Sequence, residues 1–388
     1  LASGQVDPFA ADSRYSPQFF ATASGVDIAR SVLAMAIDKS DTALVRDAIE
    51  ALGKTSGSGA MFNSGGRQPL LECLRYPDRR VQYDAALVLG SALPKRAFPG
   101  DGQVVQLLAS AVRGGGSSYA VVIAGSDENR NQIGGMLRDN GFTVLNGGET
   151  FYEVEPEIVN SSGVDLIVVD ESPKETGKIV GQIRTNEMTS ATPVVVVTDR
   201  ANIASMNREF SSDNATGAWI AGTSPDAFRN ATNNLIRRAS GGLMTQADVM
   251  SYTRDALETL HTIAIEGNNI YKIRTAEAPL LEAMNSISGA MRMLVAKVVA
   301  NVPTANCQRA LIDAALAADG SDKTQLLDFA AMSAQKIGNQ ASQRQIDALG
   351  QLITDSAGSS GDPVADAAGR LHGALNLSPD TAVKLITD

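Results

Sequence analysis

The sequence predicts a multidomain protein of mixed α and α/β class, in which two helical arrays flank one α/β domain with a parallel sheet. Three observations predict this arrangement. The chain has 388 residues, which is too long for one ordinary domain. A short helical pattern recurs near both ends of the chain. Between residues 118 and 240 that pattern gives way to alternating strands and helices.

Composition excludes several classes of protein and of site. The net charge of −10 and the lack of clustered Lys and Arg argue against a nucleic-acid partner. No run approaches the ~20 apolar residues of a membrane span. Cys73 and Cys307 lie in apolar helical patterns, so we expect buried free thiols. His261 and His372 are far apart in the sequence, so we expect neither a His-based metal site nor a Ser-His-Asp triad. We also predict no cofactor.

Residues 1–25 are expected to form an extended N-terminal segment. The stretch "LASGQVDPFAADSRYSPQFF" has no charged region followed by an apolar core, so no signal peptide is visible. The chain begins at Leu1 and not at Met, which leaves open a mature form from which a signal peptide was removed.

Residues 26–113 are predicted to form helical repeats. The sequence "DAIEALG" at 47–53 recurs as "DAALVLG" at 84–90, and its small residues allow neighbouring helices to stack closely. An Asp-containing turn, an Arg-Val pair, alanines and a final Leu-Gly resemble the second helix of a HEAT-type repeat. The glycine- and serine-rich stretch 55–66 is expected to be a loop inside this array.

The same rhythm returns in residues 245–388. Apolar helical faces, each followed by a turn signal, occur at 289–304, 322–338 and 361–379, with further amphipathic stretches between them. Helix–turn–helix units in series predict a HEAT-like α-solenoid, and a generic helical bundle is the alternative.

Residues 118–240 are predicted to form the α/β domain, between glycine-rich linkers at 111–118 and 237–242. Continuous Val and Ile runs predict strands that are buried on both faces, hence a parallel sheet with helices on each side. Five βα units are the number found in a flavodoxin-like domain, and ligands bind such sheets at the carboxyl ends of the strands. The predicted strands are 119–125, 142–148, 164–170, 192–199 and 217–222.

This segment resembles a response-regulator receiver domain in several landmarks. They are Asn129-Arg130 at the start of the first helix, "DNGF" before the second strand, "DLIVVD", "TPVVVVTD" and "TSP". In that family the aspartate of the third strand accepts a phosphoryl group from a histidine kinase, and an acidic pair after the first strand holds Mg²⁺. The resemblance implies that Asp170 occupies the phosphoacceptor position and that Thr198 occupies the switch-hydroxyl position.

The sequence departs from the family at the positions that carry the chemistry. The acidic pair falls at Ala124 and Gly125, and the lysine that follows the fifth strand is Ser224. Phosphoryl transfer to a carboxylate requires a divalent cation that neutralises the developing charge. The segment is therefore expected to be a pseudo-receiver, which keeps the fold and has lost the chemistry.

Two further expectations follow for the acidic residues around this strand. Asp170 is expected to cap a loop or to pair with Lys174 or Lys178. In an alternative register, Asp127 and Glu128 supply the acidic pair.

The predicted function is a non-enzymatic interaction or scaffold protein of bacterial signalling, with other proteins or a second copy of itself as partners. One alternative is a phosphorylation-dependent switch with Asp170 as the phosphoacceptor. Another is a self-assembling structural or envelope subunit. The receiver-like domain favours a cytoplasmic location, and removal of a signal peptide would imply an exported form.

Overall fold

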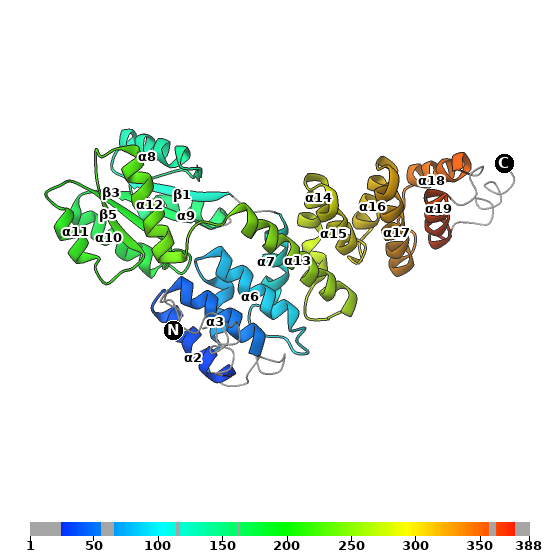
Figure 1. Ribbon diagram of the computed structural model, residues 1–388, viewed down its shortest axis with the longest axis horizontal. Helices are drawn as coiled ribbons and strands as arrows, with labels where there is room; N and C mark the ends of the chain where they lie inside the picture. The colour runs from blue at the N-terminus through cyan, green and yellow to red at the C-terminus, as the bar shows by residue number, and fades with distance from the viewer. Residues whose placement is uncertain (1–24, 56–65, 114–116, 162, 357–361, 377–388) are drawn as a thin grey trace, which may run out of the picture. The chain divides into compact units, whose positions relative to one another are not determined.

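The computed structural model describes residues 25–55, 66–113, 117–161, 163–356 and 362–376 (Figure 1). Almost all of the expected N-terminal segment 1–25 and of the expected loop 55–66 lies outside these residues. The described chain combines many helices with one parallel sheet, which confirms the mixed α and α/β class. None of its described helices is long and apolar enough to cross a membrane.

The chain folds into two compact units that do not follow the linear order of the sequence. The first unit comprises residues 1–92, 98–100 and 115–249, and the second comprises 93–97, 101–114 and 250–388. Helix α7 (Asp101–Val112) belongs to the second unit because it packs against α14 (Glu277–Ser286). The last helix of the predicted N-terminal array therefore folds with the C-terminal helices.

The sheet of the first unit has five parallel strands in the order β2-β1-β3-β4-β5. In the register of β1 and β3, Ala124 pairs with Asp170. Four of the strands lie within two residues of their predicted ends. The strands are β1 (Ser118–Ala124), β2 (Phe142–Val144), β3 (Leu166–Asp170), β4 (Val194–Thr198) and β5 (Thr216–Ile220).

The second strand is shorter than predicted because the chain leaves the sheet after Val144 and returns at Gly148. The N–H of Gly148 donates to the carbonyl of Val122 at 3.2 Å, and the carbonyl of Gly148 accepts from the N–H of Ala124 at 2.9 Å. At Gly147 an added Cβ would lie 2.5 Å from the carbonyl oxygen of Val122. A residue with a side chain would therefore force this segment away from β1.

Helices cover both faces of the sheet. The first face carries α8 (Asp127–Asp139) and α12 (Pro225–Ser240), whose apolar side chains pack on Val122, Val168 and Val195. The opposite face carries α9 (Phe151–Asn160), α10 (Pro173–Thr185) and α11 (Ile203–Glu209). The predicted linker at 237–242 is wrong in part, since α12 continues to Ser240 and ends on Gly241 in a left-handed C-cap, with φ 82°.

The N-terminal helices of the first unit pack in sequence order, with α3 in contact with both α2 and α6. An added Cβ at Gly53 of α3 would lie 2.9 Å from Cγ2 of Val88 in α6, so the two repeated segments approach closely, as their small residues predict. Arg46 donates to Asp84 across the same pair at 2.8 Å. The elements are α2 (Val26–Asp38), α3 (Thr42–Thr55), α5 (Pro69–Glu72), η2 (Cys73–Arg75) and α6 (Arg79–Ser91).

In the second unit, helices from α14 onward contact the next helix or the next but one along the chain. Cys307 is a buried free thiol here, as Cys73 is in the first unit, which confirms the prediction for both. Helix α13 begins in the first unit and continues into the second. Besides α7 and α14, the helices of the second unit are α13 (Gln246–Glu266), η3 (Ile273–Ala276), α15 (Gly289–Val299), α16 (Ala305–Ala317), α17 (Gly320–Ile337), α18 (Gln343–Ser356) and α19 (Pro363–Ala374).

Candidate functional site

Asp170 ends β3 at the carboxyl edge of the sheet, where the sequence predicted it. Its carboxylate accepts a hydrogen bond from Nδ2 of Asn129 at 2.8 Å. Asn129 lies in the first turn of α8, which Ser126 caps by accepting from the N–H of Asn129. Partial burial raises the pKa of Asp170, and the hydrogen bond from Asn129 opposes that rise.

The expected pairing of Asp170 with a lysine of α10 is wrong for Lys178, whose ammonium lies 2.7 Å from Glu175. Lys174 is exposed in the first turn of the same helix. Among the residues that the structure describes, Asp170 forms no salt bridge, and its side-chain partner is the amide of Asn129. The Asp170 carboxylate is thus held by a neutral donor.

Other groups occupy the positions Ala124 and Gly125, where the receiver family has its acidic pair. The carboxylate of Glu171 leans over Gly125, since an added Cβ there would lie 2.8 Å from Oε1 of Glu171. Burial raises the pKa of Glu171, and the nearby carboxylate of Asp170 adds to the rise. The guanidinium of Arg130 donates to the carbonyl of Ala124 and to the carboxylate of Asp127. A cationic side chain and a glycine therefore occupy the end of β1.

The alternative acidic pair points to solvent. Asp127 and Glu128 lie in the first turn of α8, and the Asp127 side chain is 88% exposed. Their carboxylates suit the positive end of the helix dipole.

The two remaining predicted positions have local structural partners. Thr198 is buried at the end of β4, and its carbonyl accepts from the N–H of Ala221 at 2.9 Å. Ser224 is the N-cap of α12, where its hydroxyl oxygen accepts from the N–H of Ala227 at 3.2 Å. The structure brings Asp170 and Thr198 to the same edge of the sheet, while the hydrogen bond to the Asp170 carboxylate comes from Asn129.

Within the described part of the chain, no group of three or more His, Cys, Asp or Glu side chains is placed to hold a metal ion. His261 and His372 lie on different helices of the second unit, and burial lowers the pKa of both.

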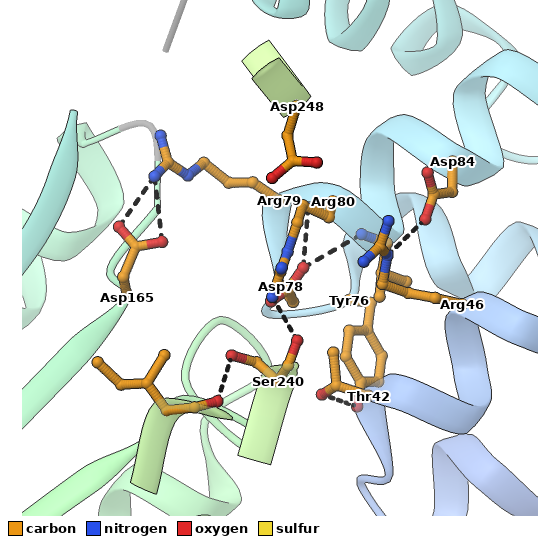
Figure 2. A network of polar contacts seen from close by, with 12 residues as sticks. Thr42, Arg46, Tyr76, Asp78, Arg79, Arg80, Asp84, Asp165, Ser240 and Asp248 are labelled. Atoms are coloured by element: carbon orange, nitrogen blue, oxygen red, sulfur yellow. Dashed lines mark hydrogen bonds and ion pairs between the residues drawn. The ribbon is translucent and has the colours of Figure 1, made fainter. Parts of the chain in front are cut away.

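A second polar cluster, which the sequence did not predict, lies at the amino edge of the sheet (Figure 2). Nη2 of Arg79, at the start of α6, donates to both carboxylate oxygens of Asp165 at 2.9 and 3.1 Å and to the carbonyl of Ser117 at 3.0 Å. The Arg79 guanidinium also lies 5.7 Å from the ring centroid of Tyr119. Burial raises the pKa of Asp165, and Arg79 and the N–H of Tyr119 oppose that rise.

The neighbouring Arg80 extends this cluster to the end of α12, where it donates to the carbonyl of Ser240. Asp78 caps α6 by accepting from the N–H groups of Arg80 and Val81 at 2.9 and 3.3 Å. Figure 2 shows how these contacts join α6 to the strand entry at Asp165 and to Ser240. The sequence feature that could have indicated this cluster is the pair Arg79-Arg80 in the first turn of α6. Positive charges there are unfavourable with the helix dipole, so anionic or carbonyl partners are expected.

The outer strand β5 borders a hollow of about 300 Å³ between α11 and α12. Arg238 of α12 reaches over this edge and donates to the carbonyls of Asn214 and Thr216 at 3.0 and 3.2 Å. A charged side chain that occupies edge carbonyls protects a sheet against pairing with another strand. Arg238 therefore disfavours the addition of another strand at the β5 edge.

No protein-family model, curated protein or solved structure matches the chain. The function is accordingly inferred from the two edges of the sheet and from the stacked helices.

Proposed function

We propose that this protein is a non-enzymatic interaction or scaffold protein, in which HEAT-like arrays flank a flavodoxin-like pseudo-receiver domain. The observation that carries the proposal is the end of β1 beside Asp170. Ala124 pairs with Asp170 in the sheet, Glu171 leans over Gly125, and Arg130 binds the Ala124 carbonyl.

These contacts are unsuited to phosphoryl transfer. An aspartate that accepts a phosphoryl group needs a divalent cation beside it, and cation ligands are carboxylates and carbonyls. Here the Ala124 carbonyl already binds the guanidinium of Arg130, whose positive charge opposes a second cation at this place. The hydroxyl of Ser224, at the position of the family's lysine, caps α12 and carries no positive charge.

The helices of the second unit support the repeat part of the proposal. Helices α14, α16 and α18 contact one another in succession, and so do α15, α17 and α19. Two rows of helices in which successive members are in contact are expected of an α-solenoid, so this pattern supports the proposal. Such an array offers a continuous surface to another protein, and we assign its concave face to that role.

Treatment of the full chain with acetyl phosphate and Mg²⁺ tests the proposal against the phosphorylation-switch alternative. In that alternative an Asp170 oxygen attacks the phosphorus, the P–O bond to acetate breaks, and acetate leaves. We expect no more radiolabelled phosphate on the native chain than on Asp170→Asn. A stable label that this substitution removes would replace the scaffold proposal with the switch.

The self-assembly alternative is less favoured because Arg238 occupies the carbonyls at the β5 edge. Light scattering over a range of protein concentrations separates the two ideas. A molar mass that rises with concentration to large assemblies would support a self-assembling subunit, and a constant monomer mass would remove it.

A further inference from the structure

Helix α9 is apolar on both of its sides. Its inner side packs Phe151, Val154 and Ile158 against the sheet. On its outer side Tyr152 is 68% exposed and Val159 is 56% exposed. These two side chains are seven residues apart, which is two helical turns, so they lie on one face. Together the two side chains expose apolar surface on the outer side of α9.

The same helix is surrounded by negative charge. The sequence from 142 to 173 contains no lysine or arginine. Among the described residues, none of the carboxylates on or next to α9 takes part in a salt bridge within 4.0 Å. These carboxylates belong to Glu149, Glu153, Glu155 and Glu157.

Three of these carboxylates are held in place by neutral donors. Glu153 accepts from the N–H of Glu149 at 2.9 Å and so closes the first turn of the helix. Glu155 accepts from Asn186 at 2.8 Å, and Glu157 accepts from Asn146 at 3.0 Å. Each carboxylate has lone pairs left for a further donor.

Pro156 adds another acceptor between Tyr152 and Val159. Because proline has no N–H, it cannot donate to the carbonyl four residues earlier, which is that of Tyr152. The face made by Tyr152, Glu155, Pro156 and Val159, which we call the α9 face, therefore offers hydrogen-bond acceptors and apolar groups together.

We propose that the α9 face docks a basic amphipathic helical segment of a partner protein. This inference rests on the proposed function, since it assigns the pseudo-receiver domain a contact of its own. Glu155, which bonds Asn186, and Glu157, which bonds Asn146, lie on opposite flanks of α9. Lysine or arginine side chains along the two edges of the partner segment would donate to these two carboxylates, and its apolar side chains would cover Tyr152 and Val159 between them. A second copy of this chain would bring two acidic faces together, so charge complementarity selects a different partner.

The probe for the test is a fluorescein-labelled peptide of about 18 residues, five helical turns, with leucine on one face and lysine on the other. A second peptide has glutamate in place of every lysine. Binding to the full chain is measured by fluorescence anisotropy at about 0.15 M salt, where weak long-range attraction is screened.

Two variants change the α9 face and the carboxylates on its flanks without removing the hydrogen bonds of those carboxylates. Glu155→Gln/Glu157→Gln keeps an oxygen acceptor for each asparagine, and Tyr152→Ser/Val159→Ser changes exposed side chains only. Glu153 is left intact because it closes the helix start. The matched controls lie on α13, where Glu258→Gln/Glu266→Gln removes the same charge and Ile265→Ser changes a side chain that is also 56% exposed.

We expect the lysine peptide to bind, each α9 variant to weaken its affinity about tenfold, and the α13 variants to change it less than about twofold. The glutamate peptide is expected not to bind. No binding of the lysine peptide, or equal binding to the native chain and the α9 variants, would overturn this inference. Neither result bears on the proposed function, whose own failure would appear as a phosphoryl label on Asp170.

Discussion

Replacing Arg79 by methionine is expected to destabilise the first unit by about 2–4 kcal/mol. Methionine keeps the apolar stem and removes the guanidinium, which is 4% exposed and holds Asp165 through two hydrogen bonds. Removing one partner of a buried ion pair costs about 3–5 kcal/mol, because the other charge stays buried without compensation. Asp165 is 23% exposed, so solvent reaches it in part and the expected cost is somewhat smaller.

The assay is urea unfolding of the full chain followed by tryptophan fluorescence. Trp219 is the only tryptophan of the chain, is 8% exposed, and packs edge-on to Phe228 at 4.9 Å between ring centroids. Its emission therefore reports on the core of the α/β domain. The free energy of unfolding follows from linear extrapolation to zero urea.

The control is Lys178→Gln, which breaks the exposed pair with Glu175 on the same domain. This change is expected to cost no more than about 1 kcal/mol. Arg79→Met combined with Asp165→Asn should be less destabilised than the two single variants added together, because it leaves no buried charge unpaired. A loss below about 0.5 kcal/mol for Arg79→Met, or strict additivity in the double variant, would refute the reasoning.

Two further predictions concern groups whose pKa burial shifts. Burial raises the pKa of Cys307 to about 11, with a smaller effect from Glu277, and it raises the pKa of Cys73 as well. Both thiols should resist Ellman's reagent at pH 8 in the native chain and react in denaturant, and fast reaction of either one without denaturant would contradict this. Burial lowers the pKa of His261 and His372, so the folded chain binds their protons less tightly than the unfolded chain. Helical stability measured by circular dichroism should be full above about pH 6.5 and fall as the pH drops through the lowered folded pKa values. His261→Gln/His372→Gln should flatten this fall, and an unchanged slope would be the contrary result.

Strands β3 and β4 were predictable because each is a continuous run of Leu, Ile and Val that ends in a polar residue. Such runs are buried on both faces whatever the neighbouring strands are, so β3 and β4 were placed to within two residues. The second strand was too long in the prediction. Its end depends on the close approach of Gly147 to Val122, which is a contact between distant residues.

The partners of the predicted site residue were not predictable in the same way. The sequence placed Asp170 at a strand end, while Asn129, Gly125 and Glu171 meet there only through the packing of α8 and the turn after β3. Lysines on the next helix were the nearest cations in the sequence, yet Lys178 bonds within its own helix to Glu175. Local spacing could not distinguish these outcomes, because both obey the same helix geometry.

Hydrophobic periodicity along the sequence by itself determined that helices lie on either side of a parallel sheet, since it reflects which faces must leave water. Tertiary structure alone decided that Arg79 meets Asp165 and that α7 folds with the C-terminal helices. It also left α9 with exposed apolar side chains between carboxylates on its two flanks. These features arise from contacts between residues that are far apart in the sequence. Local sequence patterns do not specify which distant charge or apolar face a residue will contact.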